Sequence, residues 1–379
     1  VSGRTYSVPI YATLRLILWS DTVDNAKKEI KVIKEQEVFL CDLPLMTENA
    51  SFIINGAERV VVSQMRRAPG IFFDSEDQKA TNAKIYKAKI VPQVGAWLDF
   101  EFDAKDLLYF KIDKKRKIPV TTLLRALELD VEDIIKTFYK EFTITLVKDK
   151  WIVDFDYEKV LGRRFDYDIV NADNDEVVIK KSTKITKRLL EKLKESGFKR
   201  YYLNATMAVH YLSAENISDQ KTGEILLSAG VELSEEKLDA LKDMNVKKIN
   251  VVNTELSDIG PFLFKTLQID KNDSYESALF DIFKAVRVGE NVSSLEQAEK
   301  LFTSLFFTSR YNLSPVGRMK MNYRLGISVP QETLHLTKDD LIATIRVLCK
   351  IKNNDEKTDD IDNLTNRRLK AVGELIEPQ

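Results

Sequence analysis

The chain has 379 residues, too long for one ordinary domain, and its hydrophobic content of 44% can fill two or three cores. Its 58 Lys and Arg residues balance 59 Asp and Glu residues, so net charge does not indicate a nucleic-acid binder and any such role must come from local clusters. There is no run of about 18 apolar residues and no signal peptide, so we expect neither a helical membrane span nor a secretory leader.

The first part of the chain predicts strands. Residues 5–19 and 27–41 are rich in β-branched and aromatic residues that partly alternate, which is typical of two long strands joined by a turn at 21–25. After Pro44, residues 52–54 and 60–62 flank Asn55-Gly56, a dipeptide that readily adopts the positive φ values of a tight hairpin turn.

Arg66 and Arg67 precede Pro69 and Gly70, so a turn presents two guanidinium groups at the end of hydrophobic strands. On composition alone, such a pair is more often a solvated surface feature than a binding site.

Strand-like runs follow at 83–91, 96–102 and 107–112, and then a helix that Pro119 starts and another at 131–139. Later helices are predicted within 260–308, at 315–324 and at 339–350, with an exposed connection at 287–293. A polar, acidic loop then leads to a last helix that starts at 367–370.

Residues 142–260 contain an internal repeat in which each copy predicts a strand, an N-capped helix, a left-handed turn and a second strand. The matching pairs are Glu176 and Glu224, Thr186 and Ser234, Leu190 and Leu238, Leu193 and Leu241, Gly197 and Asn245, and Lys199 and Lys247. Two copies are too few for a solenoid, so we expect a compact inserted module. The fold class expected is α+β and multi-domain: a part with mixed β-sheet, and an α/β part that carries the inserted β-α-β repeat module.

Three acidic residues, Asp99, Glu101 and Asp103, alternate with apolar residues and would share one face of a strand with Trp97. They could bind Mg²⁺ for phosphoryl transfer, although the solvated face of a half-buried strand is the more common explanation. His210 and His335 are isolated from other metal-ligating or triad residues, and phosphate-binding glycine loops are absent.

Cationic residues form three tracts: Lys111 with Lys114, Lys115, Arg116 and Lys117; Arg318 with Lys320 and Arg324; and Arg367 with Arg368 and Lys370. Each alone is most often a solvated face, but tracts that converge on one groove would follow a phosphate backbone. Trp97 is either a core residue or a surface on which an unpaired base stacks.

The two cysteines, Cys41 and Cys349, lie far apart in the sequence, each in an apolar setting. This spacing argues against a disulfide framework or a zinc site and indicates a reducing compartment, so we expect a cytoplasmic protein. The chain begins without Met and ends without a terminating signal, so we expect an internal segment of a larger protein.

Six tracts resemble, in the same order, the β subunit of bacterial DNA-directed RNA polymerase. They are KEQEVFLCDLPLMTENASF, FIINGAERVVVSQMRRAPGIFFD, WLDFEFD, IDKKRKIP, RYNLSPVGRMKMN and DDIDNLTNRRLKAVGE. The resemblance implies part of the protrusion at 1–57, the lobe at 58–364 and a return toward the protrusion at 365–379. In this family these parts form one jaw of the cleft for downstream DNA, and 284–294 matches the gate loop.

The resemblance also implies a pocket for the non-template strand, formed by Arg67, Trp97, Arg287, Asp362 and Arg367. Trp97 would stack on one base, and Asp362 would accept hydrogen bonds from the ring N–H and the amino group of a guanine. The arginines would hold phosphates or brace Asp362. Further phosphate contacts are possible at Lys114, Lys115, Arg116, Arg368 and Lys370, and Val62 and Gln64 match positions of the rifampicin pocket.

In this family the catalytic Mg²⁺ belongs to the β′ subunit, so we expect no cofactor and no catalytic residue in this segment. The implied partners are the downstream duplex and the non-template strand, the rest of β, β′, the α dimer, ω and a sigma factor, with elongation factors at the gate loop and no membrane. The sequence departs from the family at Gln93-Val94, where a basic residue is common, and at Val288, where a proline is common.

Two other classes of function stay open from the residues alone. One is a free-standing Mg²⁺-dependent phosphotransferase that uses Asp99, Glu101 and Asp103. The other is a scaffold on which residues 142–260 dock a regulator.

Overall fold

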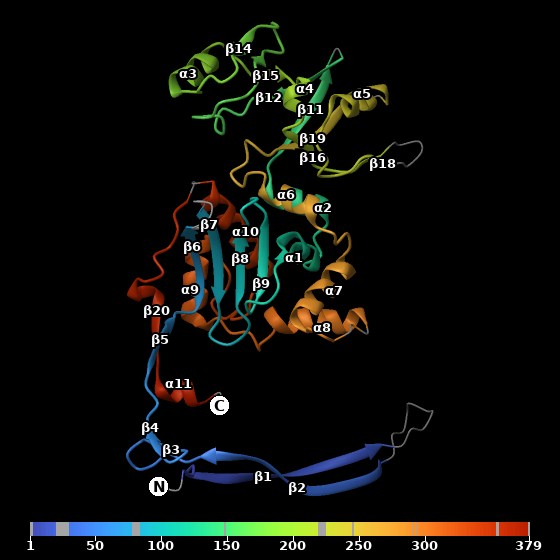
Figure 1. Ribbon diagram of the computed structural model, residues 1–379. Coiled ribbons are helices and arrows are strands. Elements are labelled where there is room, and N and C mark those ends of the chain that lie inside the picture. Colours follow the sequence, from blue (N-terminus) through green and yellow to red (C-terminus); the bar gives the residue numbers. More distant parts are fainter. Residues whose placement is uncertain are drawn as a thin grey trace. The chain divides into compact units, whose positions relative to one another are not determined.

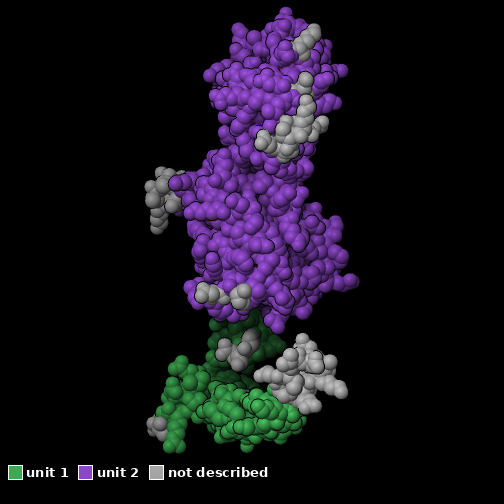
Figure 2. All heavy atoms as spheres, turned by 90° about the vertical axis from the view of Figure 1, so that its right-hand side faces the viewer, with its two compact units in different colours: residues 1–66, 367–379 green, residues 67–366 purple. Residues whose placement is uncertain are grey.

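The computed structural model describes residues 3–19, 30–77, 84–147, 149–218, 225–244, 246–290, 292, 294–353 and 356–377. The chain forms two compact units, which Figure 2 colours separately: unit 1 comprises residues 1–66 and 367–379, and unit 2 comprises residues 67–366. Within the described ranges, no helix is long and apolar enough to cross a membrane.

A long two-stranded ribbon dominates unit 1 (Figure 1). Its strands, β1 (Ser7–Trp19) and β2 (Ile30–Pro44), pair antiparallel, which confirms the two predicted strands. The turn predicted at 21–25 lies outside the described residues. Successive residues Leu16 and Ile17 point to opposite faces of the ribbon and are both exposed, so neither face is buried within this unit.

The Asn55-Gly56 dipeptide forms the predicted tight turn, with φ values of 54° and 79°. It joins β3 (Phe52–Ile54) to β4 (Ala57–Arg59), and Ile54 pairs with Ala57. The prediction that residues 60–62 form the second strand is therefore wrong. A two-residue turn makes residue 57 the first partner, and the short pairing ends before Val60.

Residues 367–370 form strand β20 (Arg367–Lys370) and not the start of the predicted last helix. This strand pairs with β5 (Gln64–Arg67), and a 3₁₀ turn (Leu364–Asn366) precedes it. Arg, Leu and Lys are good helix formers, but intrinsic propensity is worth less than about 1 kcal/mol per residue, so pairing with a strand from far earlier in the chain outweighs it. Helix α11 (Val372–Ile376) follows.

The first sheet of unit 2 is antiparallel with the order β10-β9-β8-β7-β6. The three strands predicted between residues 83 and 112 are confirmed. The strands are β6 (Gly70–Asp77), β7 (Lys84–Val91), β8 (Leu98–Phe102), β9 (Leu108–Ile112) and β10 (Ile118–Pro119).

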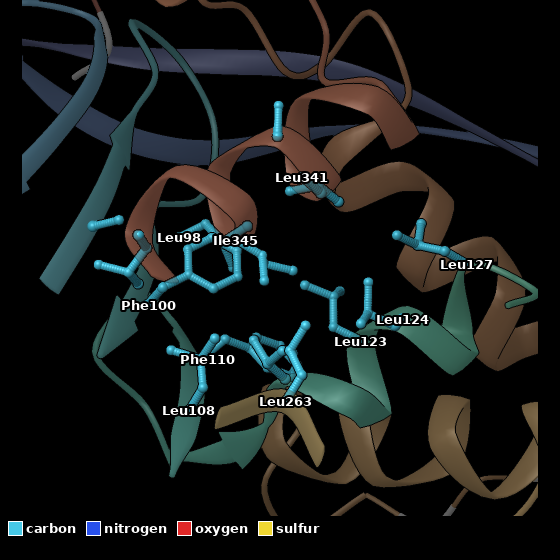
Figure 3. Packing of buried hydrophobic residues seen from close by; sticks show 14 of the residues in the cluster. Leu98, Phe100, Leu108, Phe110, Leu123, Leu124, Leu127, Leu263, Leu341 and Ile345 are labelled. Atoms are coloured by element: carbon cyan, nitrogen blue, oxygen red, sulfur yellow. The ribbon is translucent and has the colours of Figure 1, made fainter. Parts of the chain in front are cut away.

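Helices cover one face of this sheet and bury the alternating apolar residues of its strands (Figure 1). In Figure 3, Phe100 and Phe110 from the sheet meet Leu123, Leu263 and Ile345 from three different helices. The helices are α1 (Val120–Ala126), α2 (Val131–Phe138), α6 (Phe262–Ile269), α7 (Tyr275–Val286), α8 (Leu295–Phe306), α9 (Ser314–Leu325) and α10 (Lys338–Lys352).

A second sheet, with the order β15-β12-β11-β19-β16, has its own hydrophobic core drawn from residues 144–256. Thr186 and Ser234 cap two helices of equal length, as the repeat predicts, while Glu224 and Asn245 lie outside the described residues. The elements are β11 (Glu141–Val147), β12 (Lys150–Asp154), β13 (Ile169–Val170), β14 (Val177–Ile179), α3 (Lys187–Glu195), β15 (Arg200–Tyr202), α4 (Ala205–Ala208), β16 (Tyr211–Ser213), β17 (Ile217–Ser218), β18 (Ile225–Leu227), α5 (Glu235–Asp243) and β19 (Lys248–Asn253).

Arg318 is fully buried, so the prediction that it belongs to an exposed cationic tract is wrong. Its Nη1 atom donates to both carboxylate oxygens of Asp340, at 2.7 and 2.8 Å, and Nε donates to the carbonyl of Thr333 at 2.8 Å. Arg324 of the same tract forms ion pairs with Glu356 and Asp359. These two arginines therefore hold elements of unit 2 together.

The two cysteines are both free thiols. Cys349 is buried in the core of the first sheet, whereas Cys41 is exposed, so the apolar setting predicted for both holds only for Cys349.

Candidate nucleic-acid interface

Trp97 immediately precedes β8, and its ring is half-buried against Ala68, Phe72 and Val91. It therefore lies outside the large core of the first sheet, on a small apolar cluster of its own. A ring that is supported on one side and partly exposed on the other has the geometry of a stacking surface.

The loop that carries Trp97 is fastened at its start. The backbone N–H groups of Gln93 and Val94 donate to the carbonyl of Asn312, at 2.8 and 3.1 Å, and the Asn312 N–H donates back to the Val94 carbonyl at 2.8 Å. Gly95 has a φ of +131°, and a Cβ atom there would lie 2.7 Å from the Tyr311 ring. Only glycine fits this approach without displacing the ring.

The loop is also fastened at Trp97 itself. The Trp97 N–H donates to the Asp113 carboxylate at 2.8 Å, and the Asp113 N–H donates to the Trp97 carbonyl at 2.9 Å. Sequence reasoning missed Asp113, although an acidic residue directly before a run of four cations in a turn was a visible signal.

Asp362 lies on a segment that runs beside the start of β6. The Asp359 N–H donates to the Phe73 carbonyl at 2.8 Å, and the Ala68 N–H donates to the Asn366 carbonyl at 3.0 Å. Asp362 is exposed, and its N–H donates to the Asp360 carboxylate at 3.1 Å. Residues 359–366 and Trp97 thus rest on the same stretch, Ala68–Phe73, which directly follows Arg67.

Arg287 directly follows helix α7 and is exposed. Its guanidinium group donates to the Glu290 carboxylate at 3.1 Å. The Arg287 side chain also lines a pocket of about 500 Å³ together with Lys300 and Arg310. Residues Thr365 and Asn366, beside Asp362, line a different pocket of 200 Å³. Of the proposed gate loop 284–294, residues 284–286 still belong to α7, and 291 and 293 lie outside the described residues.

Arg367 belongs to unit 1, where its guanidinium group lies 3.9 Å from the Met65 sulfur. In the same unit Arg368 forms an ion pair with Glu374. Val62 and Gln64, the proposed rifampicin-pocket positions, are exposed. Of the five residues of the predicted pocket, four belong to unit 2 and Arg367 belongs to unit 1.

The turn between β9 and β10 holds most of the first cationic tract. Lys115 Nζ donates to the Val286 carbonyl at 2.6 Å, and Arg116 lies 3.3 Å from the Asp281 carboxylate. Lys111 and Lys117 both pair with Glu101. Lys114 is exposed, and its positive charge acts to lower the pKa of the nearby Asp99 carboxyl.

The carboxylates of Asp99 and Glu101 on β8, and of Asp103 directly after it, do not form the uniformly solvated face that was expected. Glu101 is buried between Lys111 and Lys117; burial alone would raise its pKa, but the hydrogen bonds from the two ammonium groups outweigh burial and lower it. Burial raises the pKa of Asp99, because the nearby cations Lys89 and Lys111 only partly compensate. Within the described ranges, no three His, Cys, Asp or Glu side chains are grouped to hold a metal ion.

Comparison with known proteins identifies the family. Residues 67–210 and 249–370 match the family described as RNA polymerase Rpb2, domain 2. The chain therefore belongs to this family.

The full-length relatives extend the comparison to both units. The chain is 46% identical over 380 aligned residues to the DNA-directed RNA polymerase subunit beta of Rickettsia akari (strain Hartford), and 45% identical to that of Rickettsia peacockii (strain Rustic). Each alignment covers 99% of this chain and 28% of the relative, so the chain spans little more than a quarter of the relatives' length.

Proposed function

We propose that this chain acts as a segment of the β subunit of a cytoplasmic DNA-directed RNA polymerase and guides DNA during transcription. It would form one jaw of the downstream cleft and hold the unpaired non-template strand. The observation that carries the proposal is the placement of Trp97, whose ring is supported from below by an apolar cluster and whose loop is fastened at Gly95 and Asp113. A preorganised ring loses little entropy when a base stacks on it.

Asp362 would give this site its preference for guanine. A carboxylate accepts two hydrogen bonds side by side, and only guanine presents a ring N–H and an amino group in that arrangement. The exposed Asp362 lies on a segment tied to Ala68 and Phe73, next to the cluster that supports Trp97. Arg67, Arg287 and Arg367 would then hold phosphates or brace the carboxylate, and Lys114 offers a further cation.

The chemistry of RNA synthesis would lie in the assembly and not in this segment. We propose that the catalytic Mg²⁺ is held by β′, and that the partners are DNA, the rest of β, β′, the α dimer, ω, a sigma factor and, at residues 284–294, elongation factors. A phosphotransferase that uses Asp99, Glu101 and Asp103 is disfavoured, because Glu101 is already neutralised by two lysines and Asp103 accepts the N–H of Ala104.

The proposal is tested in the assembled polymerase with Trp97→Ala and Asp362→Ala. Promoter-complex lifetimes are measured on templates that carry guanine, inosine or adenine at the non-template position facing Asp362. The wild type should rank guanine above inosine, which lacks the amino group, and inosine above adenine. Asp362→Ala should abolish the ranking, and Trp97→Ala should shorten the lifetime unless the stacked base is removed.

Two control variants make the result specific. Trp97→Phe keeps an aromatic face and should retain most of the lifetime. Asp175→Ala removes an exposed carboxylate from the second sheet's region and should leave the ranking unchanged. If each substitution at Trp97 or Asp362 changes the lifetime by the same factor for every non-template base, so that the wild-type ranking persists, the assignment of this pocket is wrong.

A second role, docking of a regulator by residues 142–260, is supported by one observation. Most buried apolar residues of this region form a hydrophobic core of their own, while Ala214, Val252 and Ile259 pack into the core of the first sheet. Deletion of residues 142–260 from the assembled enzyme should abolish the response to such a regulator while promoter-complex lifetime keeps its base ranking. An unchanged response to every regulator tested would exclude the role.

A further inference from the structure

The turn at 113–117 has an unusual backbone. The Lys115 N–H donates to the Ile112 carbonyl at 2.9 Å, and the two residues between them, Asp113 and Lys114, have φ values of 47° and 61°. Aspartate tolerates the left-handed region, but lysine there costs about 1 kcal/mol relative to ordinary backbone. Contacts with the surrounding structure must therefore hold this turn in place.

Those contacts reach two separate parts of the candidate interface. On one side, the Asp113 carboxylate accepts the Trp97 N–H at 2.8 Å, and the Asp113 N–H donates to the Trp97 carbonyl at 2.9 Å. On the other side, Lys115 Nζ donates to the Val286 carbonyl at 2.6 Å, and Arg116 pairs with Asp281 on the same helix.

The contact with Val286 has a direct consequence for Arg287. Val286 is the last residue of α7, and the final carbonyl groups of a helix lack partners within the helix. An ammonium group at this end satisfies such a carbonyl and interacts favourably with the helix dipole. Arg287 is the next residue, so Lys115 fixes the point from which the Arg287 side chain departs.

We propose that the turn 113–117 is a positioning element that sets the distance between the Trp97 indole and the Arg287 guanidinium group. Asp113 holds the backbone of the residue that stacks on a base, and Lys115 holds the backbone next to the residue that takes a phosphate. The ligand is a single nucleic-acid strand, in which base and phosphate are separated by a fixed covalent distance. This inference rests on the proposed function. It adds Asp113 and Lys115, whose hydrogen bonds described above hold the protein backbone and not a base or a phosphate.

The test uses the assembled polymerase with Asp113→Ala, Asp113→Asn, Trp97→Ala and the double variant Asp113→Ala/Trp97→Ala. Lifetimes are compared on promoters with either a normal base or an abasic site at the non-template position facing Trp97. The base-dependent part of the lifetime is the ratio between the lifetimes on the normal and the abasic promoter. Asp113→Ala removes a charged hydrogen bond that orients Trp97, so it should reduce this ratio about threefold to tenfold. Asp113→Asn keeps an acceptor oxygen and should restore the lifetime to within about twofold.

Asp103→Ala is the matched control. Asp103 also accepts a backbone N–H, that of Ala104, in the neighbouring turn between β8 and β9, but it has no hydrogen bond to Trp97. This variant should leave the base-dependent lifetime unchanged. A loss as large as that of Asp113→Ala would show a general effect on the sheet and overturn the positioning role.

The remaining outcomes separate this inference from the proposed function. If Asp113 acts through Trp97, the double variant should be no worse than Trp97→Ala alone. Additive losses, or a base-dependent lifetime that stays at the wild-type level in Asp113→Ala while Trp97→Ala loses it, would overturn the inference and leave the proposed function intact. A Trp97→Ala variant whose lifetime responds to the abasic site as strongly as that of the wild type would overturn both.

Discussion

The buried ion pair between Arg318 and Asp340 yields a stability prediction at the scale of single residues. Both side chains have no exposed surface, so water cannot solvate one charge when the other is removed. We predict that Arg318→Met destabilises the protein by about 3–5 kcal/mol, because it leaves the Asp340 carboxylate uncompensated. Urea unfolding of the variant measures this loss.

The double variant Arg318→Met/Asp340→Leu serves as the control. It removes both charges and should recover most of the loss, except for about 1 kcal/mol, because the Asp340 carboxylate also accepts the N–H of Thr337 in the capping box of α10. A double variant that is less stable than either single variant would contradict this account of the pair.

Glu101 predicts a dependence of stability on pH. Its pKa is lowered from 4.5 in the folded state, so its contribution is fully present above pH 4.5 and is lost as the pH falls through the folded-state pKa. Glu101→Gln should therefore cost about 1–2 kcal/mol at pH 7 and less at pH 3. Unfolding by urea at both pH values measures the difference from the wild type.

Glu76→Gln is the matched variant on the same sheet, because Glu76 pairs with Lys87 but its side chain is 58% exposed. Solvent screens such a pair, so its loss should cost less than about 1 kcal/mol at either pH. A pH-independent loss in Glu101→Gln would show that its ion pairs with Lys111 and Lys117 contribute no stability.

Residue roles were predictable from the sequence only where neighbours in the chain determine them. The Asn55-Gly56 turn follows from the conformational freedom of two adjacent residues. The burial of Arg318 does not, because it depends on a carboxylate at the start of α10 that folding brings to it. For the same reason the sequence left Trp97 undecided between core and surface, and its support by Ala68 and Phe72 emerges only from the fold.

At the scale of elements, Gly317 allows α9 to pack closely against the chain at Pro69. A Cβ atom on Gly317 would lie 2.9 Å from the Pro69 Cβ and 3.2 Å from its backbone carbon, so the helix or the strand would have to move. We predict that Gly317→Ala destabilises the protein by about 1–3 kcal/mol despite the better helix propensity of alanine. Thermal or urea unfolding measures the effect.

Gly373 provides the comparison, because it also lies in a helix, α11, and a Cβ atom there would meet nothing within 4 Å. Gly373→Ala should leave stability unchanged or raise it by up to about 1 kcal/mol. Equal effects of the two substitutions would show that close packing of α9 is unimportant.

Helices and strands were predicted correctly where apolar residues recur with the spacing that places them all on one buried face. Strands β7, β8 and β9 bury alternate residues, so their pattern is readable without knowledge of their partners. Strand β20 has no such pattern, and its partner β5 lies at the other end of the sequence. The candidate interface shares this difficulty, since Asp113 and Asn312 reach the Trp97 loop from different elements.

At the scale of the whole molecule, the two units differ in how much apolar surface they bury. The two large cores draw all their buried residues from unit 2, whereas the ribbon of unit 1 exposes Leu14, Leu16 and Ile33. A two-stranded ribbon is marginally stable by itself, since it has no second layer against which to bury a face.

We therefore predict that residues 67–366 fold without unit 1. The fragment should unfold cooperatively in urea, and Leu98→Ala, at a fully buried position, should destabilise the fragment and the complete chain by the same amount, about 2–5 kcal/mol. Equal losses follow only if the core around Leu98 is complete within unit 2. A fragment that fails to fold, or a loss that is much smaller than in the complete chain, would mean that this core depends on residues of unit 1.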